Sequence, residues 1–252
     1  MMKKKIATSV LTFLTTPLVF AATYAPMKDE PIYVPSYFLS LSVGPVWADD
    51  AGRTQTLLLA PEVLKTYAAD KSTDALVDGE VFLGWQKTIS PGFIGQFGLA
   101  AAATSNARLS GDIWDDADPQ FNNYTYSYRI HHSHVAAKGK LLMDRGWYVM
   151  PWISGSVGVG FNRAEEFNNV PTIPEAVVNA NFASHTKTTF TYTLGAGLQK
   201  AITPNLQVGV GYEFADWGKS ELSRALGQTN GTGLTLDHLY TNGVLFNITF
   251  LA

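Results

Sequence analysis

Residues Leu206-Gln-Val-Gly-Val-Gly-Tyr-Glu-Phe-Ala215 alternate between a large apolar side chain and a small or polar one. The final segment, Gly243-Val-Leu-Phe-Asn-Ile-Thr-Phe250, follows the same pattern. Because successive side chains of a strand point to opposite faces, a period of two predicts β-strands with one apolar and one polar face. The polar face of these strands holds glycine and small polar residues, with little Lys or Glu.

Outward from these two segments, the same period predicts eight strands in all. They cover residues 37–47, 79–89, 93–103, 124–142, 147–162, 187–200, 206–215 and 238–250. The connections alternate between long segments and tight turns. The long ones are 48–78, 104–123, 163–186 and 216–237, and the turns centre on Pro91, Arg145 and Pro204. Four long loops on one side and three short turns on the other are typical of outer-membrane barrels.

The polar face also distinguishes a membrane barrel from a water-soluble sandwich, the alternative that strand alternation leaves open. A sheet face in water would be expected to carry more charge. In an eight-stranded barrel the interior is barely wide enough for side chains, so small residues are needed there. We therefore predict an all-β, eight-stranded, antiparallel up-and-down transmembrane barrel whose apolar side chains face lipid. The ladder must close, because no sheet edge is stable in hydrocarbon.

Composition and the first residues place the chain outside the cytoplasm. The chain has 252 residues, 15% of them charged, a net charge of −3 and no cysteine, which excludes disulfides and thiolate chemistry and gives no basic footprint for nucleic acid. Lys3 to Lys5, an apolar stretch over residues 6–20 and the small-residue site ending at Ala21 predict a signal peptide over 1–21. We expect a periplasmic lead-in over 22–36 and the barrel over 37–252, with both ends of the mature chain in the periplasm.

The segments at 192–199, 202–218, 238–250 and 151–162 resemble strand-turn-strand motifs of the opacity-type outer-membrane β-barrel superfamily, and most of all those of Legionella-type surface antigens. The resemblance covers most of the mature chain. It implies a surface-exposed integral protein for adhesion, host contact or envelope integrity. Expected partners are outer-membrane lipid and lipopolysaccharide, a host or surface ligand at the loops, and the insertion machinery, which would read the last strand near Phe250. The family usually ends on an aromatic residue, whereas Leu251 and Ala252 follow here.

Four charged residues lie on the small-residue face of their strands: Glu80, Lys138, Lys140 and Glu213. We predict that they point into the barrel and pair, because unpaired charge in a low-dielectric interior is very costly. Pairing favours a salt-bridge plug that fills the lumen, and a gate or ion path is the alternative.

Two loop segments are candidate contact sites. Leu57, Leu58 and Leu59 make the first long loop unusually apolar, which predicts an extramembrane hairpin or a contact surface. The second long loop carries Trp114 together with three acidic residues, Asp115, Asp116 and Asp118. These carboxylates suit either a weak calcium site or an ordinary solvated acidic loop.

Histidines 131, 132 and 134 raise two chemical alternatives. His131 and Ser133 share a strand face, as in lipid A deacylase barrels, but a turn centred on Asp144 and Arg145 places them opposite residues 158 and 156, where no carboxylate completes a triad. His132 and His134 share the other face and supply two metal ligands, which is too few without loop donors. We assign no catalytic residue, cofactor or metal.

Aromatic residues near strand ends suggest interface girdles. Phe38 is expected near the periplasmic side and Trp217 near the outer side. The function predicted is a non-enzymatic surface protein that acts through its loops. A narrow channel for small molecules is the alternative, and a lipid-modifying barrel enzyme is a third class.

Overall fold

Eight antiparallel strands close into a ring in the computed structural model, which describes residues 36–49 and 51–252. Each strand pairs with the next, and the last pairs with the first. The predicted eight-stranded up-and-down barrel is thus confirmed. In ring order the strands are β1 Ser36–Ala48, β4 Ala75–Ser90, β5 Phe93–Thr104, β7 Asn122–Met143, β8 Met150–Pro171, β9 His185–Thr203, β10 Leu206–Asp216 and β13 Tyr240–Leu251.

The predicted signal peptide, 1–21, and all of the predicted lead-in except Ser36 lie outside the described residues. Ser36 already belongs to β1. Within the part of the chain that the structure describes, no helix has the length and hydropathy of a membrane span.

The outside of the barrel is apolar and the inside is polar. Leu99, Ile153 and Phe190 are 58%, 60% and 64% exposed, whereas Gln96 and Thr193 are buried on the inner face. A closed ladder satisfies every strand amide and carbonyl internally, which is the condition for crossing hydrocarbon. An apolar outer surface on such a ladder identifies a transmembrane β-barrel of the outer-membrane type.

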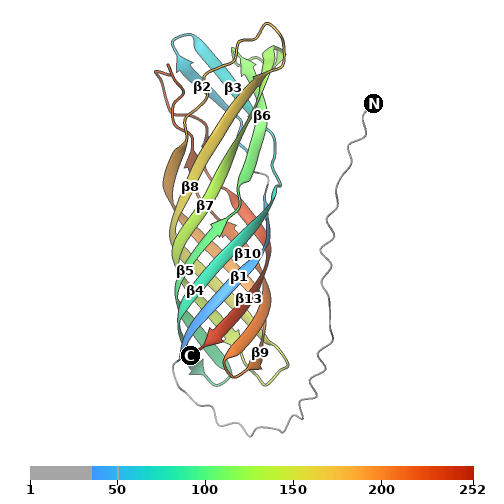
Figure 1. Cartoon of the computed structure of the whole chain (residues 1–252), viewed down its shortest axis with the longest axis vertical. Helices are drawn as coiled ribbons and strands as arrows, with labels where there is room; N and C mark the ends of the chain where they lie inside the picture. The colour runs from blue at the N-terminus through green and yellow to red at the C-terminus, as the bar shows by residue number, and fades with distance from the viewer. Residues whose placement is uncertain (1–35, 50) are drawn as a thin grey trace, which may run out of the picture. The chain divides into compact units, whose positions relative to one another are not determined.

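The long connections continue the sheet above the barrel, at the end opposite the three short turns and the end of β13 (Figure 1). The first holds a hairpin of β2 Gln55–Ala60 and β3 Val63–Ala69, and the second holds β6 Ala107–Asp115 and the 3-10 turn η1 Pro119–Phe121. The sheet order there is β2-β3-β6-β7, and β8 pairs with the other edge of β7. The last long connection contains a small pair, β11 Ser220–Glu221 and β12 Thr235–Leu236. We call this part of the molecule the extracellular sheet.

The extracellular sheet encloses a hydrophobic core of its own. Aromatic rings from Tyr67, Tyr126, Phe167 and Phe182 contact one another, with centroids 4.9 to 6.4 Å apart. Burial raises the pKa of Tyr67 and Tyr126 above that of an ordinary phenol, so both hydroxyls stay neutral at physiological pH. The predicted loops therefore form one packed body.

The strand predicted over 147–162 is displaced in the structure. β8 begins at Met150, because Gly146 turns with φ +71° and Tyr148 extends outward, where the Lys200 ammonium lies 3.4 Å from its ring centroid. β8 also continues to Pro171, well past the predicted end. A bulge where Glu166 has φ +54° interrupts the alternation there, so a period-two pattern misses the second half of the strand.

The backbones of two neighbouring strands approach each other closely enough to require glycine at one level of the barrel. Gly84 and Gly98 lie directly opposite each other in β4 and β5. A Cβ on Gly98 would lie 1.9 Å from the carbonyl oxygen of Leu83, whereas a Cβ on Gly139 of β7 would meet the Phe97 ring at an ordinary 3.6 Å.

Gly98→Ala is therefore expected to destabilise the folded barrel by about 1–3 kcal/mol, the usual effect of overpacking. Gly139→Ala is the matched control and should change stability by less than about 1 kcal/mol, or raise it, because alanine restricts the unfolded chain. Urea unfolding of the detergent-refolded proteins, followed by tryptophan fluorescence, measures both. Equal midpoints for the two variants would contradict the close approach.

Candidate functional site

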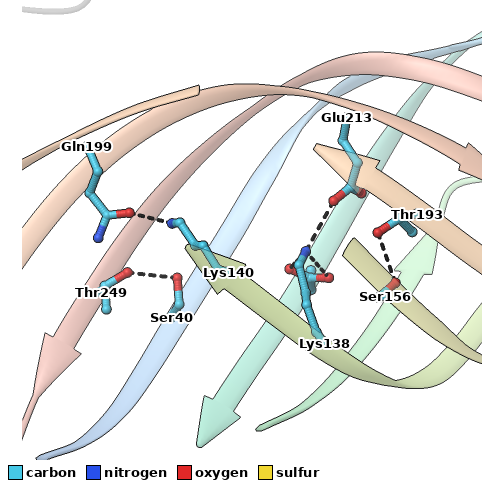
Figure 2. Close-up of polar contacts among 9 residues, drawn as sticks. Ser40, Lys138, Lys140, Ser156, Thr193, Gln199, Glu213 and Thr249 are labelled. Carbon is cyan, nitrogen blue, oxygen red and sulfur yellow. Dashed lines mark hydrogen bonds and ion pairs between the residues drawn. The ribbon is translucent and has the colours of Figure 1, made fainter. Parts of the chain in front are cut away.

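A buried three-charge cluster crosses the middle of the barrel. The Lys138 ammonium on β7 donates to both carboxylate oxygens of Glu80 on β4, at 2.7 and 2.8 Å, and to Glu213 Oε2 on β10 at 3.1 Å. Figure 2 shows Lys138 and Glu213 pointing toward each other across the lumen. All three side chains are almost fully enclosed. A lysine between two carboxylates links three separate strands through the interior.

Lys140, the fourth predicted lumen charge, points into the lumen but does not form the expected ion pair. Its ammonium donates to Gln199 Oε1 (Figure 2) and lies 4.4 Å from the centroid of the Trp152 ring. Gln199 in turn donates to Gln207 Oε1 at 2.5 Å. None of the ion pairs among the described residues includes Lys140. An amide oxygen and an aromatic face satisfy its charge, because the nearby carboxylates already bind Lys138.

Side chains leave little free space at this level of the barrel. The cavity beside the three-charge cluster has about 20 Å³ open to water, which is room for about one molecule. Toward the periplasmic end, Thr249 donates to Ser40 Oγ at 2.9 Å, and the rings of Phe38 and Phe82 meet edge to face at 4.7 Å. Phe38 lies near the periplasmic end, as predicted, but its predicted place in a lipid-facing girdle is wrong. It shares the inward parity of Ser40 and fills the interior.

Above the cluster, a histidine pair closes the outer end of the lumen. Asn162 donates through Nδ2 to the carbonyl oxygens of Trp217 and Lys219, which leaves its Oδ1 to accept from His132 Nδ1 at 2.5 Å. His132 Nε2 lies 3.0 Å from His134 Nδ1. Trp217, predicted for a girdle, is instead buried and stacks on His132 at 4.6 Å, so that prediction is wrong. Trp217 is the first residue after β10, and its side chain turns inward where Gly218 follows with φ +70°.

The register predicted for the deacylase alternative is also wrong. His131 lies opposite Arg163 and Ser133 lies opposite Phe161, rather than residues 158 and 156, because the turn before β8 is longer than predicted. His131 Nδ1 contacts Asn106 Oδ1 at 3.2 Å. Over the described ranges, no group of three or more His, Cys, Asp or Glu side chains is placed to hold a metal ion.

Sequence reasoning missed Asp78, a further buried acid. It lies two residues before Glu80 on the same inner face of β4, where its exposed fraction is 7%. The alternation of side chains that placed Glu80 on the inner face also places Asp78 there, two residues earlier. The predicted strand began at residue 79, so Asp78 was assigned to the preceding loop.

The candidate contact residues of the two loops lie at the far end of the extracellular sheet, on β2 and β6, with β3 between them. Thr66 and Lys65 of β3 are opposite Trp114 and Asp115 of β6. Lys65 donates to Asp115 Oδ1 at 2.5 Å, and its ammonium is 4.8 Å from the Tyr124 ring. Asp115 is thus held in an ion pair, Asp118 caps η1 by accepting from the Gln120 amide, and Asp116 is exposed.

In the apolar loop segment, Leu57 and Leu59 pack against the extracellular core, whereas Leu58 points outward. Beyond them a groove of about 390 Å³ separates the β2–β3 turn from the β6–η1 turn. We call it the tip groove. Its lining is Glu62, Val63, Leu64, Lys65, Asp115, Asp116, Phe121 and Asn123.

No protein-family model matches this chain, and no curated protein matches it in sequence. Similar solved structures include Neisserial surface protein A, which is 9% identical with a TM-score of 0.44 over 86% of this chain and 98% of that chain. The outer-membrane protease OmpT of Escherichia coli is 10% identical, with a TM-score of 0.46 over 86% of this chain and 97% of that chain. OprG of Pseudomonas aeruginosa is 12% identical, with a TM-score of 0.42 over the same shares. At these identities the roles of those proteins do not transfer to this chain.

Lys138→Met is expected to lower the free energy of unfolding by about 3–5 kcal/mol, because it leaves Glu80 and Glu213 as buried, uncompensated charges. Lys140→Met is the matched control two residues along the same face. It removes a charge that has no carboxylate partner, so we expect a change of less than about 1.5 kcal/mol. Unfolding in urea from detergent micelles measures both. A loss at Lys140 as large as that at Lys138 would refute the assignment of the ion cluster.

Proposed function

We propose that this protein is a non-enzymatic surface protein of the outer membrane whose extracellular sheet binds a partner through the tip groove. The observation that carries the proposal is the contrast between the two ends of the molecule. The lumen is filled by side chains, whereas the extracellular sheet is a packed platform that presents a groove far from the membrane.

The platform is held by contacts between distant segments, which favours a preformed binding surface. Gln55 of β2 donates to the Thr235 carbonyl oxygen at 2.7 Å, and Arg53 pairs with Asp237 at 2.7 Å. The amide of Thr229 donates to the Leu59 carbonyl oxygen at 2.9 Å. A surface that is ordered before binding loses less entropy when a partner arrives.

The chemistry of the tip groove suits a partner with an apolar and a cationic part. Val63 and Phe121 are 39% and 50% exposed at its edges. Glu62 and Asp116 provide carboxylates on the same lining, and each has a positive φ, 64° and 52°, which fixes its turn. Exposed aromatic side chains are enriched at contact surfaces, and the two carboxylates would add specificity for a cationic partner.

The filled lumen weighs against a channel. Refolded protein in planar lipid bilayers is expected to give no discrete conductance steps, because the Glu80–Lys138–Glu213 cluster and the histidine pair occupy the pore. Single-channel recording measures this, with a known porin inserted under the same conditions as the positive control. Regular ohmic steps in each insertion would contradict the plug.

The tip groove is tested by attachment. A Gram-negative laboratory strain that displays the protein should bind cultured epithelial cells or immobilised matrix protein above the empty strain. Val63→Asp with Phe121→Asp should reduce this binding about tenfold, equivalent to about 1.4 kcal/mol. Val178→Asp, an exposed apolar residue on another loop, is the matched control and should not reduce it. If the double variant is displayed at the same surface density as wild type and attachment is unchanged, the proposal is wrong.

A further inference from the structure

Three arginines lie on the outward faces of adjacent strands just above the apolar surface of the barrel. Arg108 of β6 is directly opposite Arg129 of β7, and Arg163 of β8 is opposite His131. Nearer the membrane on the same faces, the side chains are apolar and exposed, with Val135 on β7 and Phe161 on β8. The arginines therefore stand at the level where the barrel leaves the hydrocarbon. We call them the arginine cluster.

The charges of this cluster are only partly compensated within the protein. Arg129 pairs with Glu166 at 2.7 Å, and Arg163 pairs with Glu165 at 2.7 Å. Arg108 takes part in no ion pair among the described residues. Like charges directly opposite each other on neighbouring strands are destabilising, so the Arg108–Arg129 pair favours an external anion between the two guanidinium groups.

A polar groove of about 360 Å³ begins at Arg108 and continues away from the membrane. Hydroxyl and amide groups line it from three strands, with Ser110 on β6, Ser127 on β7 and Asn168 on β8. Asp70 and Asp112 add carboxylate acceptors, and Asp70 already accepts from Ser110 Oγ at 3.1 Å. Convergent hydroxyl, amide and carboxylate groups in a shallow groove suit the hydroxyls of a sugar.

The same outward level on the other side of the barrel has a different character. β1, β5, β10 and β13 contain no Lys or Arg at all. Exposed aromatic side chains such as Trp47 lie there instead. Arginine at this level is therefore found on the side of the ring formed by β6, β7 and β8, whereas the side formed by β9 and β10 carries Lys187 and Lys219.

We infer that this side of the barrel binds one molecule of lipopolysaccharide. From the membrane outward, the protein presents apolar side chains, then arginines, then a hydroxyl-rich groove. That sequence matches the acyl chains, the phosphates and the sugars of a phosphorylated glycolipid. Arginine suits the phosphate, because its planar guanidinium binds phosphate oxygens in a bidentate manner. The inference needs only the outer-membrane position of the barrel and goes beyond contact at the tip groove.

The test uses full-length mature protein refolded in detergent and titrated with purified lipopolysaccharide, with bound glycolipid counted by native mass spectrometry. Arg108→Gln with Arg129→Gln and Arg163→Gln should weaken binding at least about tenfold, since charge-assisted hydrogen bonds are the strong ones. The matched control removes three other extracellular cations by Lys187→Gln, Lys219→Gln and Arg224→Gln, and should stay within about twofold of wild type. Lipopolysaccharide without its phosphates should bind wild type as weakly as intact lipopolysaccharide binds the arginine variant.

Folding is checked by the heat-dependent gel mobility of each variant. If the triple variant does not fold, Arg108→Gln alone serves, because that guanidinium has no internal ion pair to lose, and a reduction of about threefold or more supports the site. Equal binding by the arginine variant and wild type overturns the inference. Equal competition by phosphatidylglycerol vesicles or inorganic phosphate also overturns it, since either result means a general anion site. If lipopolysaccharide binding is lost and cell attachment is intact, the proposal for the tip groove is unaffected. If attachment is lost and lipopolysaccharide binding is intact, the inference for the arginine cluster is unaffected.

Discussion

The pairing of β1 with β13 is the contact on which the rest of the molecule depends. It joins the first and last strands of the barrel, so the ring has no free strand edge. In hydrocarbon an open edge would expose amides and carbonyls with nothing to bind, so closure is a requirement rather than a refinement. Once the ring is closed at eight strands, the interior has a fixed and small width. The single-water space beside Lys138 is a consequence of that width.

The narrow interior also determines how charge can be kept there. A lone ammonium or carboxylate would be costly, so Lys138 lies between two acids and Lys140 between an amide oxygen and an aromatic ring. Because the lumen is filled, the surfaces that can bind other molecules lie on the outside of the protein. Beyond the membrane, β7 and β8 run on as 22-residue strands and support the extracellular sheet, whose groove and outward arginines face other molecules.

Much of the barrel could be predicted from the sequence, because apolar and polar residues alternate strictly along a strand that faces lipid on one side and the lumen on the other. The last three strands were found within three residues of their bounds, and Glu80, Lys138 and Glu213 were selected by parity alone. Among the extracellular strands, the β2–β3 hairpin was one of two alternatives predicted for the apolar first loop, whereas β6 was missed. The weak signal has a physical reason. β2, β3 and β6 are covered on one face by other protein and on the other by water, and the bulge at Glu166 shifts the parity of β8. Phe38 and Trp217 were misplaced because an aromatic residue near a strand end can also fill a lumen. The arginine cluster is invisible in the sequence, since Arg108 and Arg129 meet only through strand register.

The docking of the first hairpin onto the last loop has a consequence for assembly. Arg53 and Gln55 bind residues about 180 positions later in the chain, through Asp237 and Thr235. Contacts of such long sequence separation form late, because the intervening chain must be ordered first. The hairpin can therefore reach its final position only after the last loop has crossed to the outer side. Completion of the outer platform thus requires the last loop to be outside, so a barrel that stalls before that step presents no finished surface to its surroundings.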